Sequence, residues 1–269
     1  MPFNPPRGLK RDLLAGEPKI GMFLGTSSVQ VAELVAFQDL DFLFVDLEHG
    51  ERNDVLSVAE IIRAADAAGK PVIVRVPTNS VEAIGYVLDH GAVGICVPHI
   101  RTREDAERAV SYARYAPEGE RAMSPLVRAT QYSGEDWEDV WRTANDEMIV
   151  MALIEDAKGL ENLEEIASVP GIDVIWIGVG DLSQDLGFPG QLDHPKIVEA
   201  VERGLAAAKE NRKIAYTPLG GLDPGRDFHS EVEAAMAAGF RMLAWVDIVL
   251  IGAVIRDAVR SVANLRGEH

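Results

Sequence analysis

Cysteine is almost absent from this sequence: Cys96 is the only one among 269 residues. A disulfide within the chain needs two cysteines, so a disulfide framework is excluded, and the composition suits a reducing compartment. Clusters of thiolates are excluded as well, which argues against a structural zinc site of the cysteine-rich kind.

Long apolar runs are also missing. No segment has the roughly 20 consecutive apolar residues that a membrane-spanning helix needs. Residues 1–23 have no apolar stretch long enough for a signal peptide. The sequence therefore predicts a cytoplasmic protein with no membrane partner.

Basic residues are scarce relative to acidic ones. The chain has 26 Lys and Arg against 43 Asp and Glu, which gives a formal net charge of −17. Such a chain repels phosphate backbones, and no stripe of basic residues marks a nucleic-acid surface. We therefore expect no nucleic-acid partner, and we interpret the acidic surface as favouring solubility.

The sequence does have a regular alternation of short Val- and Ile-rich runs with longer amphipathic stretches. The short runs are nearly continuously apolar, which is typical of strands in a parallel sheet covered by helices. Eight β/α units in about 250 residues match a (β/α)8 TIM barrel, and an open doubly wound sheet is the alternative. The predicted strands are residues 19–25, 42–48, 72–77, 94–100, 149–155, 174–180, 213–218 and 242–247.

The longer stretches repeat their apolar positions every three to four residues, as helices do. Gly69, Gly91 and Gly239 stand where glycine commonly follows a helix end. No linker or change of composition divides the chain, so residues 1–269 are predicted to form one barrel domain. The predicted helices include residues 57–69, 80–91, 103–115 and 194–210.

Two segments go beyond a minimal barrel. Residues 116–146 are longer than an ordinary connection, and long insertions commonly form active-site rims or lids, so we predict that role here. Residues 247–265 form a predicted extra C-terminal helix whose apolar positions go most of the way round. Such a helix is expected to pack between subunits as well as on its own barrel, which predicts a homo-oligomer.

Ionisable residues gather where the predicted strands end, which is where the active sites of barrel enzymes lie. Several have a purely structural interpretation: residues 48–50 as an exposed turn, or Glu155 and Asp181 as helix caps. Five strands that deliver such residues to one rim favour a reactive site. The residues are Asp46, Glu48, His49, Arg75, His99, Glu155, Asp156 and Asp181.

Arg75 lies between valines in a predicted buried strand. A guanidinium there is costly unless it is paired with an anion, and the anion is either a protein carboxylate or a ligand. Glu155 and Asp181, on neighbouring strands, form a pair suited to a hard divalent cation. A cation beside a buried arginine and a histidine makes a site that stabilises an oxyanion and moves a proton.

Gly178 and Gly180 follow a predicted strand, but Ser183 occupies the third glycine position of a dinucleotide-binding motif. No long helix follows directly, so we do not predict a dinucleotide site. The two glycines permit a ligand to approach the backbone closely, and the N–H groups beside Asp181 are suited to a small carboxylate.

The sequence resembles the HpcH/HpaI family of class II aldolases, which require a metal ion and act on pyruvate and which include 4-hydroxy-2-oxoheptanedioate aldolase. The resemblance covers essentially the whole chain. It is carried by the segments FLFVDLEHG, KPVIVRVPTNSVEAIGYVLDHGAVGICVPHI, RYAPEGERA, ALIEDAKGLENLEEIASVPGIDVIWIGVGDLSQDLGFPG and VDIVLIGA.

The resemblance implies three catalytic roles. His49 matches the catalytic proton acceptor, and Asp89 matches the aspartate that raises the basicity of this histidine. Arg75 matches the arginine that stabilises the enolate and the developing alkoxide. Because side chains alternate along a strand, Asp46 and His49 share one pocket only if the strand ends near Leu47.

The resemblance also implies the ligands and the reaction. Glu155 and Asp181 match the ligands of one divalent ion (Mg²⁺, Mn²⁺ or Co²⁺), and the backbone of Gly180 and Asp181 matches the pocket for the pyruvate carboxylate. The implied enzyme is a lyase that cleaves 4-hydroxy-2-oxo acids, through an enolate held at the metal, to an aldehyde and pyruvate or a related acid such as hydroxypyruvate. The implied assembly is a hexamer in which the C-terminal helix is exchanged between subunits.

Two departures from the family leave the substrate open, and one of them is the sequence GVGD at residues 178–181, where the family has GPAD. Leu153 stands where family members often have a glutamine that reaches the bound oxo acid, so a polar contact is lost. Two alternatives therefore remain. One is the same enolate chemistry in a citramalyl-CoA-type lyase or an oxaloacetate decarboxylase, for which Arg121 and Arg128 are the candidates to bind CoA phosphates. The other is a non-catalytic barrel that binds a 2-oxo acid.

Overall fold

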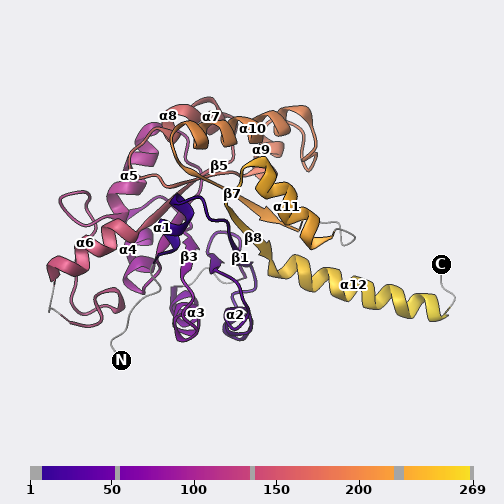
Figure 1. The fold of residues 1–269 in the computed structure, drawn as a ribbon, viewed down its shortest axis with the longest axis horizontal. Helices are drawn as coiled ribbons and strands as arrows, with labels where there is room; N and C mark the ends of the chain where they lie inside the picture. Colours follow the sequence, from indigo (N-terminus) through magenta and orange to yellow (C-terminus); the bar gives the residue numbers. More distant parts are fainter. Residues whose placement is uncertain (1–7, 52–54, 134–136, 221–226, 267–269) are drawn as a thin grey trace.

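Eight parallel strands form a closed barrel in sequence order (Figure 1). This computed structural model describes residues 8–51, 55–133, 137–220 and 227–266. The predicted (β/α)8 barrel is confirmed, and the open sheet is excluded because the first strand pairs with the last. The strands are β1 (Lys19–Leu24), β2 (Phe42–Asp46), β3 (Val72–Arg75), β4 (Gly94–Val97), β5 (Ile149–Ile154), β6 (Val174–Ile177), β7 (Ile214–Leu219) and β8 (Met242–Val246).

Helices follow the strands and cover the outside of the barrel (Figure 1). Several begin at a capping residue, such as Thr102, whose side chain accepts the N–H of Asp105 in a capping box. Gly69, Gly91 and Gly239 follow helix ends with positive φ, as predicted. The helices are α1 (Leu9–Leu14), α2 (Val29–Ala36), α3 (Val55–Ala67), α4 (Val81–Asp89), α5 (Arg103–Ala113), the 3-10 turn η1 (Arg128–Thr130), α6 (Trp137–Glu147), α7 (Ala157–Glu161), α8 (Leu163–Ala167), α9 (Val179–Asp185), α10 (Pro195–Glu210), α11 (Phe228–Ala238) and α12 (Asp247–Arg266).

Side chains that alternate along each strand build two separate cores. Phe42 and Phe44 of β2 belong to a cluster inside the barrel, whereas Leu43 and Val45 belong to the larger cluster between strands and helices. Two buried leucines of α1 join the inner cluster. Because apolar side chains fill the barrel interior, polar chemistry is confined to its end.

The described residues 116–133 and 137–146 lie between α5 and β5, and their role as a rim or lid stays a prediction. Helices of a β/α barrel run antiparallel to its strands, so the segment that joins α5 to β5 lies at the amino-terminal end of the barrel. Arg121 packs there over the ring of Tyr115, 4.3 Å from its centroid, and donates to Asp89 at 3.2 Å.

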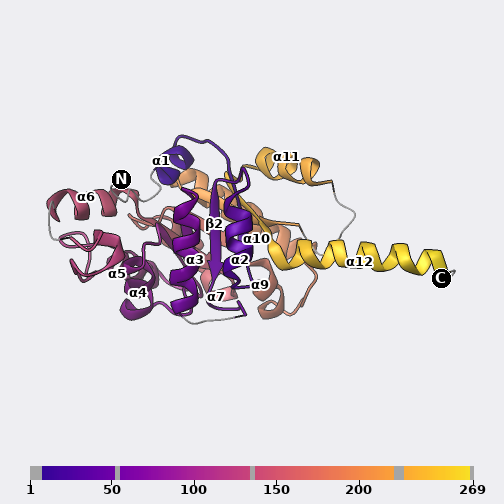
Figure 2. The ribbon, with the colours of Figure 1, turned by 90° about the horizontal axis from the view of Figure 1, so that it is seen from below.

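Helix α12 begins beside β1 and β8 and then projects away from the barrel (Figures 1 and 2). The predicted C-terminal helix at residues 247–265 is therefore confirmed as a helix. The carboxylate of Asp247 anchors its start by accepting the N–H of Gly25 at 2.9 Å and the hydroxyl of Thr26 at 2.7 Å. Its exposed apolar side chains are Ile248, Ile251, Val254, Ile255, Val259 and Val262. Within the described ranges, no helix is both long and apolar enough to cross a bilayer.

Candidate active site

The site starts in the turn that ends β2. The strand stops at Asp46, as required for Asp46 and His49 to share a pocket, and the Asp46 carboxylate accepts the N–H of Glu48 at 3.0 Å. A Cβ at Gly50 would lie only 2.2 Å from the carbonyl oxygen of Asp46. Glycine is therefore required at position 50, because any side chain would force the turn open.

Arg75 ends the neighbouring strand β3, directly in register with Asp46. Its Nε and Nη2 atoms donate to the two carboxylate oxygens of Asp46 at 2.7 and 2.6 Å. The guanidinium carbon lies 5.6 Å from the ring centroids of both Phe23 and Trp176. The anion that sequence analysis required for Arg75 is thus a protein carboxylate, held in the bidentate geometry that suits a guanidinium.

Burial disfavours the charged guanidinium of Arg75, but the hydrogen bonds and charge of Asp46 outweigh it and raise the pKa of Arg75 further above its usual range. Glu48 adds a second negative charge, with Oε2 at 3.0 Å from Nη1 of Arg75. This contact has ion-pair distance without hydrogen-bond geometry, and the buried Oε2 atom has no hydrogen-bond partner among the described residues. Arg75 therefore stays charged, and Glu48 keeps unused acceptor capacity.

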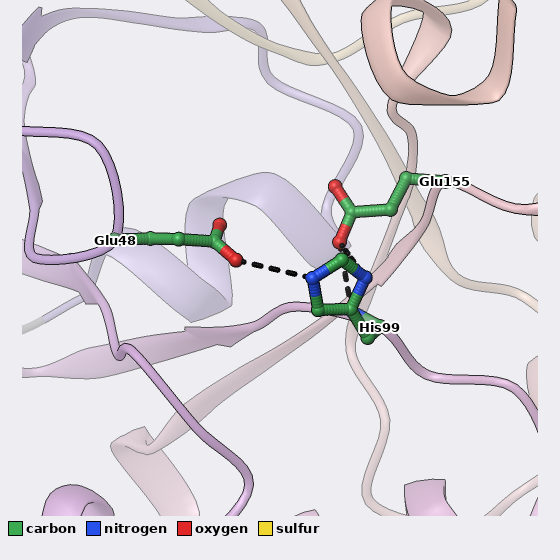
Figure 3. A group of neighbouring side chains, drawn as sticks. All are labelled: Glu48, His99 and Glu155. Atoms are coloured by element: carbon green, nitrogen blue, oxygen red, sulfur yellow. Dashed lines mark hydrogen bonds and ion pairs between the residues drawn. The ribbon is translucent and has the colours of Figure 1, made fainter. Parts of the chain in front are cut away.

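Glu155 follows β5 and faces His99, which follows β4. Oε1 of Glu155 accepts the backbone N–H of His99 at 2.8 Å and lies 3.0 Å from Nδ1 of its ring. The other ring nitrogen, Nε2, lies 3.4 Å from Oε1 of Glu48. Figure 3 shows the imidazole between the two carboxylates.

Negative charge is in excess around Glu155. The side chain of Glu155 is 2% exposed, and burial raises its pKa above the usual range. The N–H and charge of His99 act against this shift, whereas the negative charges of Glu48 and Asp181 add to it. A positive charge placed between these carboxylates would relieve their repulsion.

Asp181 is the third residue of α9, and its carboxylate is close enough to influence Glu155 electrostatically. The interpretation of Asp181 as a helix cap is wrong, because Gly178 occupies the cap position. A Cβ on Gly178 would lie 2.8 Å from the Cβ of Glu155, whereas one on Gly180 would meet nothing within 4 Å. Glycine at 178 thus permits close contact with Glu155, and the backbone at 180 is open.

Glu155 does not cap a helix either. The helix after β5 is capped by Asp156, whose side chain accepts the N–H of Gly159 at 2.8 Å. The carboxylate of Glu155 is therefore free of a capping role, and its contacts are with the residues at the barrel end.

The structure does not bring His49 and Asp89 together. The side chain of His49 is 63% exposed, with Nε2 at 3.9 Å from Oε2 of Glu48. Asp89 ends α4 and contacts Arg121 at the amino-terminal end of the barrel. No hydrogen bond or ion pair joins His49 to Asp89 in the part of the chain that the structure describes. The pairing that the resemblance implies is therefore not formed between these two residues of one described chain.

The residues at the barrel end fit a divalent ion. Glu48, His99 and Glu155 each offer a ligand atom, and these atoms lie within 4.8 Å of one another. Carboxylate oxygens suit Mg²⁺ and Mn²⁺, and an imidazole nitrogen suits later transition metals. Glu155 is a predicted ligand from the sequence, whereas the sequence pattern indicates only that His99 lies at the rim. The sequence feature that could have indicated a ligand role for His99 is its position directly after a strand, at the same rim as two acidic strand ends.

A model of the HpcH/HpaI aldolase/citrate lyase family matches residues 19–246, from the first strand to the last. A pyruvate aldolase of Rhizobium etli is 34% identical over 247 residues, which are 92% of this chain and 94% of that protein. A 4-hydroxy-2-oxo-heptane-1,7-dioate aldolase of Escherichia coli is 36% identical over 205 residues, which are 76% of this chain and 77% of that protein.

The fold is similar to that of solved structures as well. The crystal structure of an HpcH/HpaI aldolase/citrate lyase family protein from Burkholderia cenocepacia has a TM-score of 0.86 and 31% sequence identity to this chain. The match covers 95% of this chain and 99% of the other. The similarity thus extends over the entire barrel.

Proposed function

The chain belongs to the HpcH/HpaI aldolase/citrate lyase family and is a carbon–carbon lyase, and from this premise we propose that it cleaves 4-hydroxy-2-oxo acids. The products are an aldehyde and pyruvate, or a related 2-oxo acid such as hydroxypyruvate. The buried ion pair of Arg75 with Asp46, next to Glu48, supports this assignment most directly. It places a permanent positive charge next to carboxylates that fit a cation.

Glu155 and Asp181 would hold the divalent ion, Mg²⁺, Mn²⁺ or Co²⁺, and its chemistry there is that of a Lewis acid toward the oxygens of a 2-oxo acid. The charge that Asp181 exerts on Glu155 supports their assignment as a pair. The open backbone at Gly180 supports a pocket for the substrate carboxylate beside them.

Arg75 is proposed to stabilise the negative charge that develops on substrate oxygen. A guanidinium has five N–H donors, and Asp46 takes two of them, which leaves donors for the substrate. Because the Asp46 pair and the two aromatic rings fix the guanidinium, little reorganisation is needed as charge develops. Preorganised donors of this kind typically contribute about 3–4 kcal/mol.

His49 is proposed to move the proton. Its exposed imidazole accepts the proton of the substrate's C4 hydroxyl while the C3–C4 bond breaks. The electron pair of that bond forms the enolate of the 2-oxo acid, the aldehyde leaves, and a proton then returns to C3. Asp89 assists His49 only if a second copy of the chain supplies it, since the two residues lie at opposite ends of one barrel.

The test is a cleavage assay with a 4-hydroxy-2-oxo acid, in which pyruvate release is coupled to a dehydrogenase. We expect turnover with Mn²⁺, its loss with a chelator and recovery on adding the metal back. The variant Arg75→Ala should lose at least roughly 100-fold in kcat. Turnover that survives both the chelator and this variant would refute the proposal.

The structure gives less support than the sequence to the alternative of a CoA-dependent lyase. Arg121 is buried against Tyr115 and Asp89, and Arg128 pairs with Asp66 through two nitrogens. Both arginines lie in the segment at the amino-terminal end of the barrel, so neither serves CoA phosphates in the site of the same chain. Assays with a CoA thioester as substrate would distinguish this chemistry from aldol cleavage.

A homo-oligomer, hexameric by family resemblance, is proposed from α12. The helix carries an exposed apolar row, and exposed apolar surface on this scale marks protein contacts. Exchange of α12 between subunits would bury this row. Val259→Lys should give a smaller species than the native chain in sedimentation, and an unchanged mass would argue against this role for α12.

A further inference from the structure

We propose that His99 is a direct ligand of the divalent ion through Nδ1, in addition to the carboxylate of Glu155. This inference rests on the proposed function only for the presence of such an ion. It adds a nitrogen ligand to a site otherwise built from oxygen, and it gives a role to a residue that the aldol chemistry above does not use.

The first support is the separation of the two ligand atoms. Nδ1 of His99 and Oε1 of Glu155 are 3.0 Å apart. Two adjacent ligands of an octahedral ion subtend a right angle, so bonds of about 2.1 Å place them about 3.0 Å apart. The two side chains therefore stand at the separation of neighbouring ligands of one ion.

The second support is the backbone of His99. Its φ is +54°, in the left-handed region that residues other than glycine seldom adopt. Such conformations cluster at functional sites, because the surrounding structure must hold them. Here the conformation directs the backbone N–H of His99 to Oε1 of Glu155 at 2.8 Å and places the ring beside the same oxygen. The backbone after β4 is thus held directly to the carboxylate after β5, which fixes the two ligands relative to each other.

The third support is the partner of the other ring nitrogen. Nε2 of His99 lies 3.4 Å from Oε1 of Glu48, whose second oxygen faces Arg75. Histidines that bind metals usually direct the second nitrogen to a carboxylate, which fixes the ring and its tautomer. With the proton on Nε2, the lone pair of Nδ1 is available to the ion. Figure 3 shows this order of Glu48, His99 and Glu155.

A nitrogen ligand changes which ions the site prefers. Mg²⁺ favours oxygen ligands, whereas imidazole raises affinity for later first-row ions such as Co²⁺ and Ni²⁺. We therefore expect the site to bind Co²⁺ more tightly than Mg²⁺, and we expect His99 to account for much of that difference.

Two variants test the ligand without straining the backbone, since asparagine and glycine both tolerate positive φ. His99→Asn replaces the nitrogen ligand by an amide group, and His99→Gly removes the side chain. His229→Asn is the matched control, because His229 is exposed on α11 and its ring pairs with Glu233 at 3.3 Å, away from the site. Pulsed EPR of the Mn²⁺-loaded full chain, without substrate, should show the coupling of a bound imidazole nitrogen in the native protein and the control. The coupling should vanish in both His99 variants.

Calorimetry with the metal alone gives the second readout. We expect the Kd for Co²⁺ to rise by roughly 10- to 100-fold in both His99 variants, and the Kd for Mg²⁺ to change by less than about 3-fold. Absence of the nitrogen coupling in the native protein, or its survival in His99→Gly, would overturn the proposal and leave the aldolase assignment intact. Coupling lost with His99, in a protein without aldol cleavage, would support His99 as a ligand and refute the proposed function.

Discussion

Substitution of Asp46 by asparagine is the sharpest test of the ion pair that holds Arg75. Asp46 accepts two hydrogen bonds from the guanidinium, and hydrogen bonds to charged groups contribute about 1.5–3 kcal/mol each. Asparagine keeps one acceptor oxygen and the shape of the side chain. The free energy of unfolding should therefore fall by about 2–3 kcal/mol in Asp46→Asn. It should fall by about 3–5 kcal/mol in Asp46→Ala, which leaves the buried charge without this partner.

Activity should fall as well, because Arg75 loses one of its two hydrogen bonds to residue 46 in Asp46→Asn and both of them in Asp46→Ala. In Asp46→Ala the contact with Glu48, at 3.0 Å from Nη1, is what remains. A displacement of about 1 Å at a positioning group lowers rates by up to roughly 100-fold, and we expect a 10- to 100-fold loss of kcat. Urea unfolding at one protein concentration and the pyruvate-release assay measure the two effects. The control is Asp66→Asn in the pair of Arg128 with Asp66, which lies away from the site, and its kcat should be native. A change below about 1 kcal/mol in Asp46→Asn, with native kcat, would refute the reasoning.

Three further predictions concern other parts of the chain. Gly50→Ala should destabilise the fold by about 1–3 kcal/mol and lower kcat, because its Cβ would overlap a carbonyl oxygen. Gly85→Ala, whose Cβ would lie in open space on α4, should instead stabilise the fold by about 0.5–1 kcal/mol. Similar urea midpoints for the two variants would contradict this. Burial and nearby arginines lower the pKa of His90 below 6.5 in the folded protein. The unfolded state therefore binds the proton more readily, and the free energy of unfolding should decrease as the pH falls below 6.5. His90→Asn should flatten the profile of melting temperature against pH below 6.5, and an unaltered slope would count against it. If Asp89 from a second copy serves His49, then mixing His49→Ala with Asp89→Asn chains should restore activity that neither has alone, and mixtures as inactive as their components would argue against a shared site.

The barrel was predictable because the number, spacing and apolar character of the predicted strands all indicate the same fold. All eight predicted strands are present, since continuous Val- and Ile-rich runs fit strands that are covered on both sides. The pairing of Arg75 was predictable for a similar reason: a buried guanidinium leaves few options other than a carboxylate. The sequence pattern did not identify the anion that pairs with Arg75. The register of β2 with β3 places Asp46 beside Arg75, so Asp46 is that anion.

The missed features depend on three-dimensional context. The role of His99 rests on a left-handed backbone, which local propensity disfavours for histidine and which only tertiary contacts stabilise. The position of residues 116–146 followed from topology, because a segment between a helix and the next strand lies at the amino-terminal end of a barrel. Length alone suggested a lid. Asp89 shows the same limit, since a residue matched by resemblance can lie far from its expected partner within one chain.

The charges at the barrel end explain how an acidic protein can act on an acidic substrate. Arg75 is the cation at the site, but Asp46 neutralises it within the barrel wall. Glu48, Glu155 and Asp181 remain beside it in a chain of net charge −17. Such a site repels a 2-oxo acid at long range, although the fixed guanidinium still stabilises charge at short range. In the proposed function, the net positive charge that attracts the substrate would therefore arrive with the divalent ion, so the carboxylates proposed to bind the ion would also determine whether the substrate binds.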